Sequence, residues 1–155
     1  MKKMLFSLTA LVIGVAAFSQ QAATTTAATS SKKADELVKF KESKHDFGKI
    51  KQGVPVNFDF AFNNISNQVV VIENATASCG CTTPVKPETP IAPGKASKIT
   101  AGFNAANAGV FEKTIYVKVQ GADMPLELKI TGEVLKAEDY AKYEAEKGKG
   151  KSGSK

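Results

Sequence analysis

The amino-acid sequence predicts an all-β protein, an antiparallel β-sandwich of about seven strands. Apolar and polar residues alternate along several short segments, which is the pattern of half-buried strands. Clusters of glycine, proline and asparagine separate these segments and are typical of turns. No convincing amphipathic helix interrupts them between residues 35 and 135. We therefore expect residues 35–135 to form one domain in which two sheets bury their apolar faces against each other.

The first half of this domain contains the clearest strand signal. Leu37–Lys41 is a short strand candidate. Lys44–Gly53 follows, with Phe47 and Ile50 as candidate core residues. Along Val56–Asn63, three phenylalanines alternate with polar residues and so share one face of a strand. We expect these phenylalanines to fill the core.

The second half repeats the same alternation around a loop. Gln68–Ile72 is a β-branched run that leads to the two cysteines, and Lys86–Gly94 holds three prolines and must be a loop. Alternation resumes over residues 99–103, 114–120 and 124–131. Seven short strands over about 100 residues favour a sandwich of immunoglobulin type. A closed barrel is the alternative, because periodicity does not separate the two.

The N-terminus has the three-part layout of a secretory signal peptide. Two lysines precede the apolar run Met4–Phe18, and small residues follow it. This run is shorter than the roughly 20 residues that span a bilayer. We therefore expect residues 1–19 to be cleaved rather than kept as an anchor. The cleaved protein would have no membrane span. We expect it to be exported to the periplasm or out of the cell. Residues 20–34 are low-complexity and predict a disordered linker.

The net charge of +6 lies at the ends of the chain. Residues 35–135 carry as many lysines as acidic residues, and the chain has no arginine. A folded basic face is the usual footprint of nucleic-acid binding, so we do not expect a nucleic-acid partner.

Residues 136–155 are predicted to be a charged tail, with one or two helical turns around the Glu138/Lys142 pair and disorder after them.

Both cysteines lie in one short motif, Ser78-Cys79-Gly80-Cys81-Thr82. In a fully extended chain the Cα atoms of residues i and i+2 lie about 7 Å apart, at the limit for a disulfide. Gly80 can bend the chain through a positive φ, which makes a Cys79–Cys81 disulfide a candidate. Its loop is minimal, so the loop-entropy argument assigns it little stabilising power.

Three interpretations of the pair stay open. The cysteines form a local disulfide or shape a bend as small buried side chains; they are redox-active, since strained or exposed disulfides are labile; or they bind Cu or Zn as thiolates. A metal site needs further ligands, and His45 is the only histidine of the chain. Cys79, Cys81 and His45 are therefore the candidate metal ligands, although their spacing favours no ligand set.

No set of residues in the sequence predicts catalysis. His45 is the one histidine that could act as a base for a cysteine nucleophile. The triplet Asp46-Phe47-Gly48 matches the metal-binding triplet of kinases, but the chain lacks a glycine-rich loop and a catalytic loop. We expect a protein that is not an enzyme and has no cofactor.

A larger set of residues resembles one known family. The resemblance rests on Asp46-Phe47-Gly48, Ile50, Gly53, Phe58, Phe60, Asn63-Asn64, Ser78-Cys79-Gly80-Cys81-Thr82, Pro93-Gly94, Phe103-Asn104 and Gly109. In this order they resemble the exported bacterial family called domain of unknown function fifteen-seventy-three, across residues 37–134. The resemblance implies export and a single immunoglobulin-like domain of the Hydin and major-sperm-protein type. It implies no activity, substrate or site.

Together these observations predict an exported immunoglobulin-like module that acts by binding. An extended segment of a partner can add to an edge strand of such a sandwich. The expected partner is a protein or another component of the cell envelope. The alternative is a thiol redox protein or a soft-metal (Cu/Zn) protein centred on the Cys-Gly-Cys motif.

Overall fold

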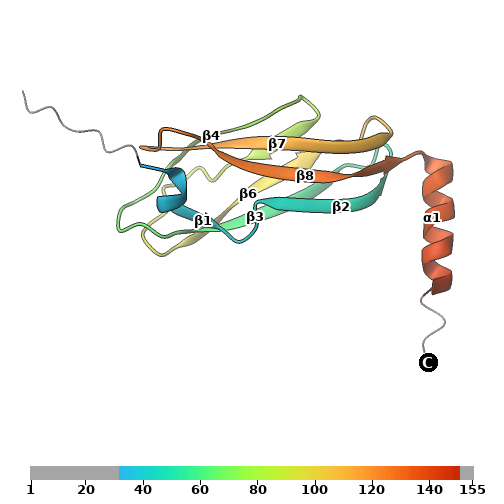
Figure 1. Ribbon diagram of the computed structural model, residues 1–155, viewed down its shortest axis with the longest axis horizontal. Coiled ribbons are helices and arrows are strands. Elements are labelled where there is room, and N and C mark those ends of the chain that lie inside the picture. The colour runs from blue at the N-terminus through green and yellow to red at the C-terminus, as the bar shows by residue number, and fades with distance from the viewer. Residues whose placement is uncertain (1–31, 151–155) are drawn as a thin grey trace, which may run out of the picture.

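The computed structural model describes residues 32–150, which form two packed β-sheets followed by a helix (Figure 1). The predicted signal peptide, most of the predicted linker and residues 151–155 lie outside the described residues. The predicted sandwich is confirmed. It has eight strands rather than about seven, and one of its strand pairs is parallel.

One sheet has the strand order β1-β3-β6-β5, and all its pairs are antiparallel. Its members are β1 (Val38–Phe40), β3 (Val56–Asn64), β5 (Thr82–Val85) and β6 (Ala96–Phe103). The phenylalanine-rich β3 lies in the middle of the sheet, and β1 and β5 are its edges. β3 therefore has a hydrogen-bonded neighbour on both sides.

The other sheet has the order β2-β8-β7-β4. Its members are β2 (Lys44–Lys51), β4 (Ile72–Ala77), β7 (Gly109–Val119) and β8 (Leu126–Leu135). β2 runs parallel to β8, whereas the sequence pattern predicted antiparallel pairs throughout. Only a short hairpin requires antiparallel pairing, and almost the whole domain separates β2 from β8 along the chain.

The core lies between the sheets and is filled from alternate positions of their strands. Phe60 and Phe62 are completely buried. Ile50 is also buried, and Phe47 is partly buried. The other inward side chains on the central strands include Ile99, Ala101, Ile115, Val117, Val119, Leu128 and Ile130. The predicted alternation of these segments is confirmed, because every second side chain of each points into the sandwich.

The apolar run at residues 69–72 is not a continuous strand. Val70 and Ile72 are buried, but Val69 is 59% exposed. β4 begins only at Ile72 and continues through polar residues, because pairing with β7 sets its bounds rather than hydrophobicity. Met124, expected within the alternation of residues 124–131, is 73% exposed because β8 begins two residues later.

Residues 46–48 form a bulge in β2, where its register with β8 shifts. The Asp46 carboxylate accepts a hydrogen bond from the Gly48 N–H at 2.9 Å, and Gly48 has a φ of 65°, which favours glycine. On β8, a Cβ at Gly132 would lie 2.8 Å from both the Gly48 carbonyl oxygen and the Phe111 ring. The close approach of the two strands therefore requires glycine at position 132.

Asn64, at the end of β3, organises the turn that follows it. Its side chain is buried, and the amide group donates hydrogen bonds to the carbonyl oxygens of Gln68 at 2.7 Å and Ile91 at 2.9 Å. Its Oδ1 accepts from the N–H and the hydroxyl of Ser66 at 2.9 and 2.8 Å. Residues 64–66 match the N-glycosylation pattern, but the donors and the acceptor of this buried amide are already hydrogen-bonded within the fold.

The C-terminal helix α1 (Ala137–Gly150) follows β8 directly and projects from one end of the sandwich (Figure 1). Its 14 residues exceed the one or two turns that the sequence predicted. It stays close to the sandwich as far as its midpoint, where Lys49 Nζ lies 5.1 Å from the centre of the Tyr143 ring. Within residues 32–150 no helix is long and apolar enough to cross a membrane.

At the N-terminal end, contacts with the sandwich begin inside the stretch that composition assigned to the linker. Lys32 forms an isolated parallel bridge with Ala122. Ala34 is buried and begins the short 3-10 helix η1 (Ala34–Glu36). The last residues before position 35 therefore belong to the folded domain.

Candidate functional site

The Cys-Gly-Cys motif lies where the chain passes from one sheet to the other. It follows β4, an edge of one sheet, and precedes β5, an edge of the other. Cys79 and Cys81 are joined in a disulfide, with their Cα atoms 5.4 Å apart. This distance is shorter than the roughly 7 Å of an extended chain, so the backbone bends within the motif.

A reverse turn produces this bend. The Thr82 N–H donates a hydrogen bond to the Cys79 carbonyl oxygen at 3.3 Å, which closes a four-residue turn. Gly80 does not have a positive φ, so the expectation that it bends the chain in that way is wrong. The hydrogen bond between the ends of the turn brings the cysteines together without a left-handed residue.

Neighbouring segments hold the turn on both sides. The Ser78 N–H donates to the Thr114 carbonyl oxygen on β7 at 2.9 Å. The Asn104 N–H, directly after β6, donates to the Cys81 carbonyl oxygen at 3.1 Å. A cavity of about 130 Å³ lies beside the turn, and the residues that line it include Cys81 and Lys113. Cys81 of the disulfide therefore borders a small cavity that a cationic residue also lines.

Thr82 is a candidate site residue that the sequence did not single out. It is 4% exposed, and its hydroxyl oxygen lies 3.7 Å from Cys79 Sγ and 4.0 Å from Cys81 Sγ. The feature of the sequence that could have identified Thr82 is its position directly after Cys81. Lys113 gave no such signal, because only the pairing of β4 with β7 brings it near the motif.

His45 lies far from the cysteines. It is on β2, at the opposite edge of the sheet from β4. Its ring stacks on the Phe58 ring with centroids 3.5 Å apart, and Phe47 meets it edge-on at 4.8 Å. Two strands separate β2 from β4, and at about 4.8 Å per strand His45 is on the order of 14 Å from the motif. The fold therefore does not place the histidine within reach of either sulfur.

The three candidate metal ligands are thus not assembled into one site. Within the described part of the chain, no group of three or more His, Cys, Asp or Glu side chains could hold a metal ion. Metal binding by cysteine requires the thiolate, and both sulfurs are joined in the disulfide. The observed arrangement corresponds to the disulfide interpretation of the motif.

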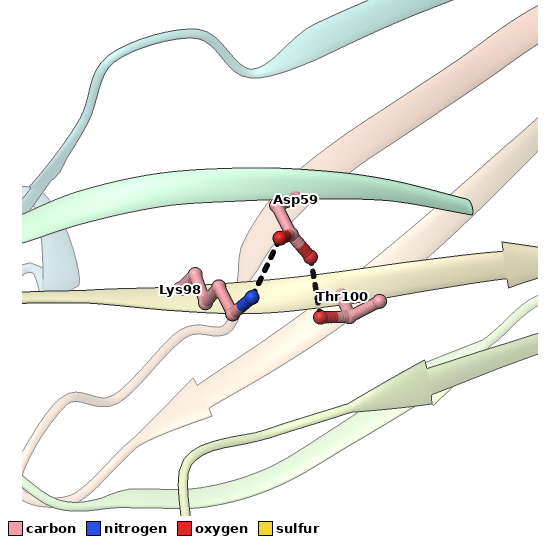
Figure 2. Close-up of polar contacts among 3 residues, drawn as sticks. All are labelled: Asp59, Lys98 and Thr100. Carbon is pink, nitrogen blue, oxygen red and sulfur yellow. Dashed lines mark hydrogen bonds and ion pairs between the residues drawn. The ribbon is translucent and has the colours of Figure 1, made fainter.

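Asp59 is the titratable group with a clear pKa shift within residues 32–150. Figure 2 shows its carboxylate on β3 directed at two side chains of β6. Lys98 Nζ and the Thr100 hydroxyl each donate a hydrogen bond to it at 2.6 Å. These bonds, first that of Lys98 and then that of Thr100, lower the pKa of Asp59 below its ordinary value of 3.8. The carboxylate therefore stays ionised near neutral pH and is no general acid there.

Asp59→Asn is expected to remove a small, pH-dependent contribution to stability. The pKa of Asp59 is lower in the folded than in the unfolded chain, so the carboxylate stabilises the fold above pH 3.8 and loses this effect as the pH falls below that value. The melting temperatures of both proteins should differ at neutral pH and converge in acid. A difference that stays constant across this range would contradict the assignment.

One family model matches residues 38–134, which is more than half of the chain; it is described as "Protein of unknown function (DUF1573)". The chain belongs to this family. The match covers the sandwich from the start of β1 to the penultimate residue of β8, and it includes the Cys-Gly-Cys turn and the bulge of β2. No curated protein matches the chain in sequence.

Solved structures share the fold of this DUF1573 protein at low sequence identity. A protein of unknown function from Porphyromonas gingivalis W83 is 14% identical with a TM-score of 0.56, over 63% of this chain and 46% of that one. The ASH/PapD-like domain 7 of human CEP192 is 11% identical with a TM-score of 0.53, over 68% of this chain and 90% of the domain. The VesB protease of Vibrio cholerae is 12% identical with a TM-score of 0.51, over 66% of this chain and 33% of the protease.

These likenesses establish an immunoglobulin-like sandwich and nothing about activity. The chain spans about half the length of the P. gingivalis protein and a third of the VesB protease. The predicted family and the predicted fold type are both confirmed.

Proposed function

We propose that this protein is an exported, non-enzymatic binding module that takes up an extended segment of another cell-envelope protein. The signal-peptide pattern of residues 1–19 supports export. The balanced charge of residues 35–135 supports a protein partner over nucleic acid. The observation that carries the proposal is the edge strand β4, which lacks the features that block strand addition.

The other edge strands have such features. β5 contains Pro84, which has no N–H to donate, and β1 is only three residues long. β2 carries a bulge and three lysines, Lys44, Lys49 and Lys51. β4 is six residues long and contains neither proline nor lysine. It is therefore the edge best suited to pair with another strand.

Register identifies the backbone groups that β4 offers. The Ser78 N–H bonds to Thr114 on β7, and bonded positions alternate along an antiparallel pair. The N–H and C=O groups of Ala75 and Ala77 therefore point away from β7. The Ala75 N–H is held by Oδ1 of Asn74 at 2.9 Å, an exposed side chain that an incoming strand can displace. An extended segment would pair with these groups by β-augmentation.

Ala75→Pro should weaken partner binding at least about tenfold, because it removes a main-chain donor that the partner strand uses. An edge strand accepts proline where the N–H faces solvent, so the pairing with β7 should persist. Wild-type protein, expressed as the full chain and recovered from the cell envelope, is used to capture partners from an envelope extract. The amides of Ala75 and Ala77 should exchange hydrogen more slowly in the complex.

Ala75→Ser is the matched control, since it keeps the N–H and changes the side chain little. A partner retained by Ala75→Ser and lost by Ala75→Pro supports strand addition to β4. The proposal is contradicted if the extract yields no partner. It is also contradicted if the partner binds Ala75→Pro as tightly as wild type. The intact mass of the recovered protein tests export separately: a chain that still contains residues 1–19 and stays in the cytoplasm contradicts it.

A further inference from the structure

We propose that the Cys79–Cys81 disulfide is an exchangeable oxidant that accepts electrons from a dithiol of another exported protein. This activity goes beyond the proposed binding function and does not depend on β4. Three observations carry it: the size of the loop that the disulfide closes, the buried hydroxyl that contacts both sulfurs, and the lysine in the adjoining cavity.

The disulfide is poorly placed to be a structural staple. It joins residues only two positions apart, and the loop-entropy contribution to stability is smallest for such short loops. Hydrogen bonds to β7 and to the segment after β6 already anchor the turn without it. Both cysteines are partly exposed, and Gly80 between them is exposed, so a thiol can reach the bond. Exposed disulfides are typically labile.

The surroundings are better suited to the reduced pair than to the disulfide. A disulfide sulfur is a weak hydrogen-bond acceptor, whereas a thiolate is charged and accepts strongly. The hydroxyl of the buried Thr82 lies within reach of both sulfurs and can donate to either one. Lys113 is the charged residue among those that line the cavity beside Cys81. Both groups would stabilise a thiolate at Cys81 once the bond opens.

The exchange balances in two steps. A thiolate of the partner attacks Cys79 Sγ, which does not pack against the core as Cys81 does. The bond between the cysteines breaks, a mixed disulfide forms at Cys79, and Cys81 leaves as a thiolate. The second thiolate of the partner then attacks the partner sulfur of the mixed disulfide and releases Cys79. The partner has lost two electrons and two protons and holds a new disulfide, and the module is a dithiol.

The test equilibrates the mature protein with glutathione redox buffers, followed by alkylation and intact mass. A reduced two-cysteine peptide serves as the dithiol in a second assay. The wild-type disulfide should open in reduced glutathione and oxidise the peptide once per molecule. Thr82→Val and Lys113→Gln should each shift the equilibrium toward the disulfide by about 2- to 10-fold, the worth of one hydrogen bond or charge contact. Thr83→Val and Lys39→Gln are the matched controls and should shift nothing.

Two results would overturn the proposal. One is a disulfide that stays closed in excess reduced glutathione and leaves the peptide reduced. The other is a thiol–disulfide equilibrium that is the same as that of wild type in both Thr82→Val and Lys113→Gln. If Thr82→Val does not fold, Lys113→Gln still tests the proposal, because Lys113 is partly exposed. Ala75→Pro should leave the equilibrium unchanged, so failure of strand addition and failure of thiol exchange are distinguishable.

Discussion

Replacing Phe62 with alanine is expected to destabilise the domain by about 3–5 kcal/mol, the usual cost of removing a large buried aromatic side chain. Phe62 is completely buried on β3, and its ring centre lies 4.9 Å from that of Phe40 on β1. The loss is a large part of the about 5–15 kcal/mol that typically stabilises a domain. Urea unfolding followed by far-ultraviolet circular dichroism measures it as a lower denaturation midpoint.

Tyr116→Ala is the matched aromatic control. Tyr116 lies on the outer face of β7 and is 38% exposed, so its removal should cost about 1 kcal/mol or less. A Phe62→Ala domain that unfolds at the same urea concentration as Tyr116→Ala would contradict the burial of Phe62 in the core.

Asn64→Ala is expected to cost about 2–4 kcal/mol, although the residue is polar and lies at a strand end. Its amide donates two hydrogen bonds and accepts two in a buried setting. Alanine removes all four of these hydrogen bonds, and each is worth about 0.5–1.5 kcal/mol of net stability. Thermal unfolding of the two proteins at neutral pH measures the loss.

The neighbouring Asn63→Ala separates this effect from a general loss of asparagine at the strand end. Asn63 is exposed on the opposite face of β3, and its replacement should change stability by no more than about 0.5 kcal/mol. Equal melting temperatures for the two alanine variants would mean that the Asn64 network contributes nothing to stability.

Much of the sandwich followed from local patterns. The alternation of β3, β7 and β8 identified their inward faces correctly, because side chains of any strand alternate between its two faces. β4 was not anticipated, since the sequence marked only the apolar run before it. An edge strand owes its existence to hydrogen bonds with a neighbour, and the polar residues of β4 show no pattern that reveals this neighbour.

The candidate site was predicted only in part. The spacing of Cys79 and Cys81 pointed to the motif, and the structure adds the turn that closes it. Thr82 and Lys113 were not singled out. Lys113 reaches the motif through the pairing of β4 with β7, which joins segments far apart in the chain, and short-range sequence patterns do not report such pairing.

Local sequence patterns were enough to predict which side chains point inward and to locate both cysteines, because these are properties of neighbouring residues. Long-range strand pairing sets which strands are edges and makes β2 run parallel to β8. It also places His45 and the cysteines at opposite edges of one sheet. It also decided that Thr82 and Lys113 lie beside the disulfide. These features depend on the order of strands in two sheets, and that order is set by burying all the apolar faces at once.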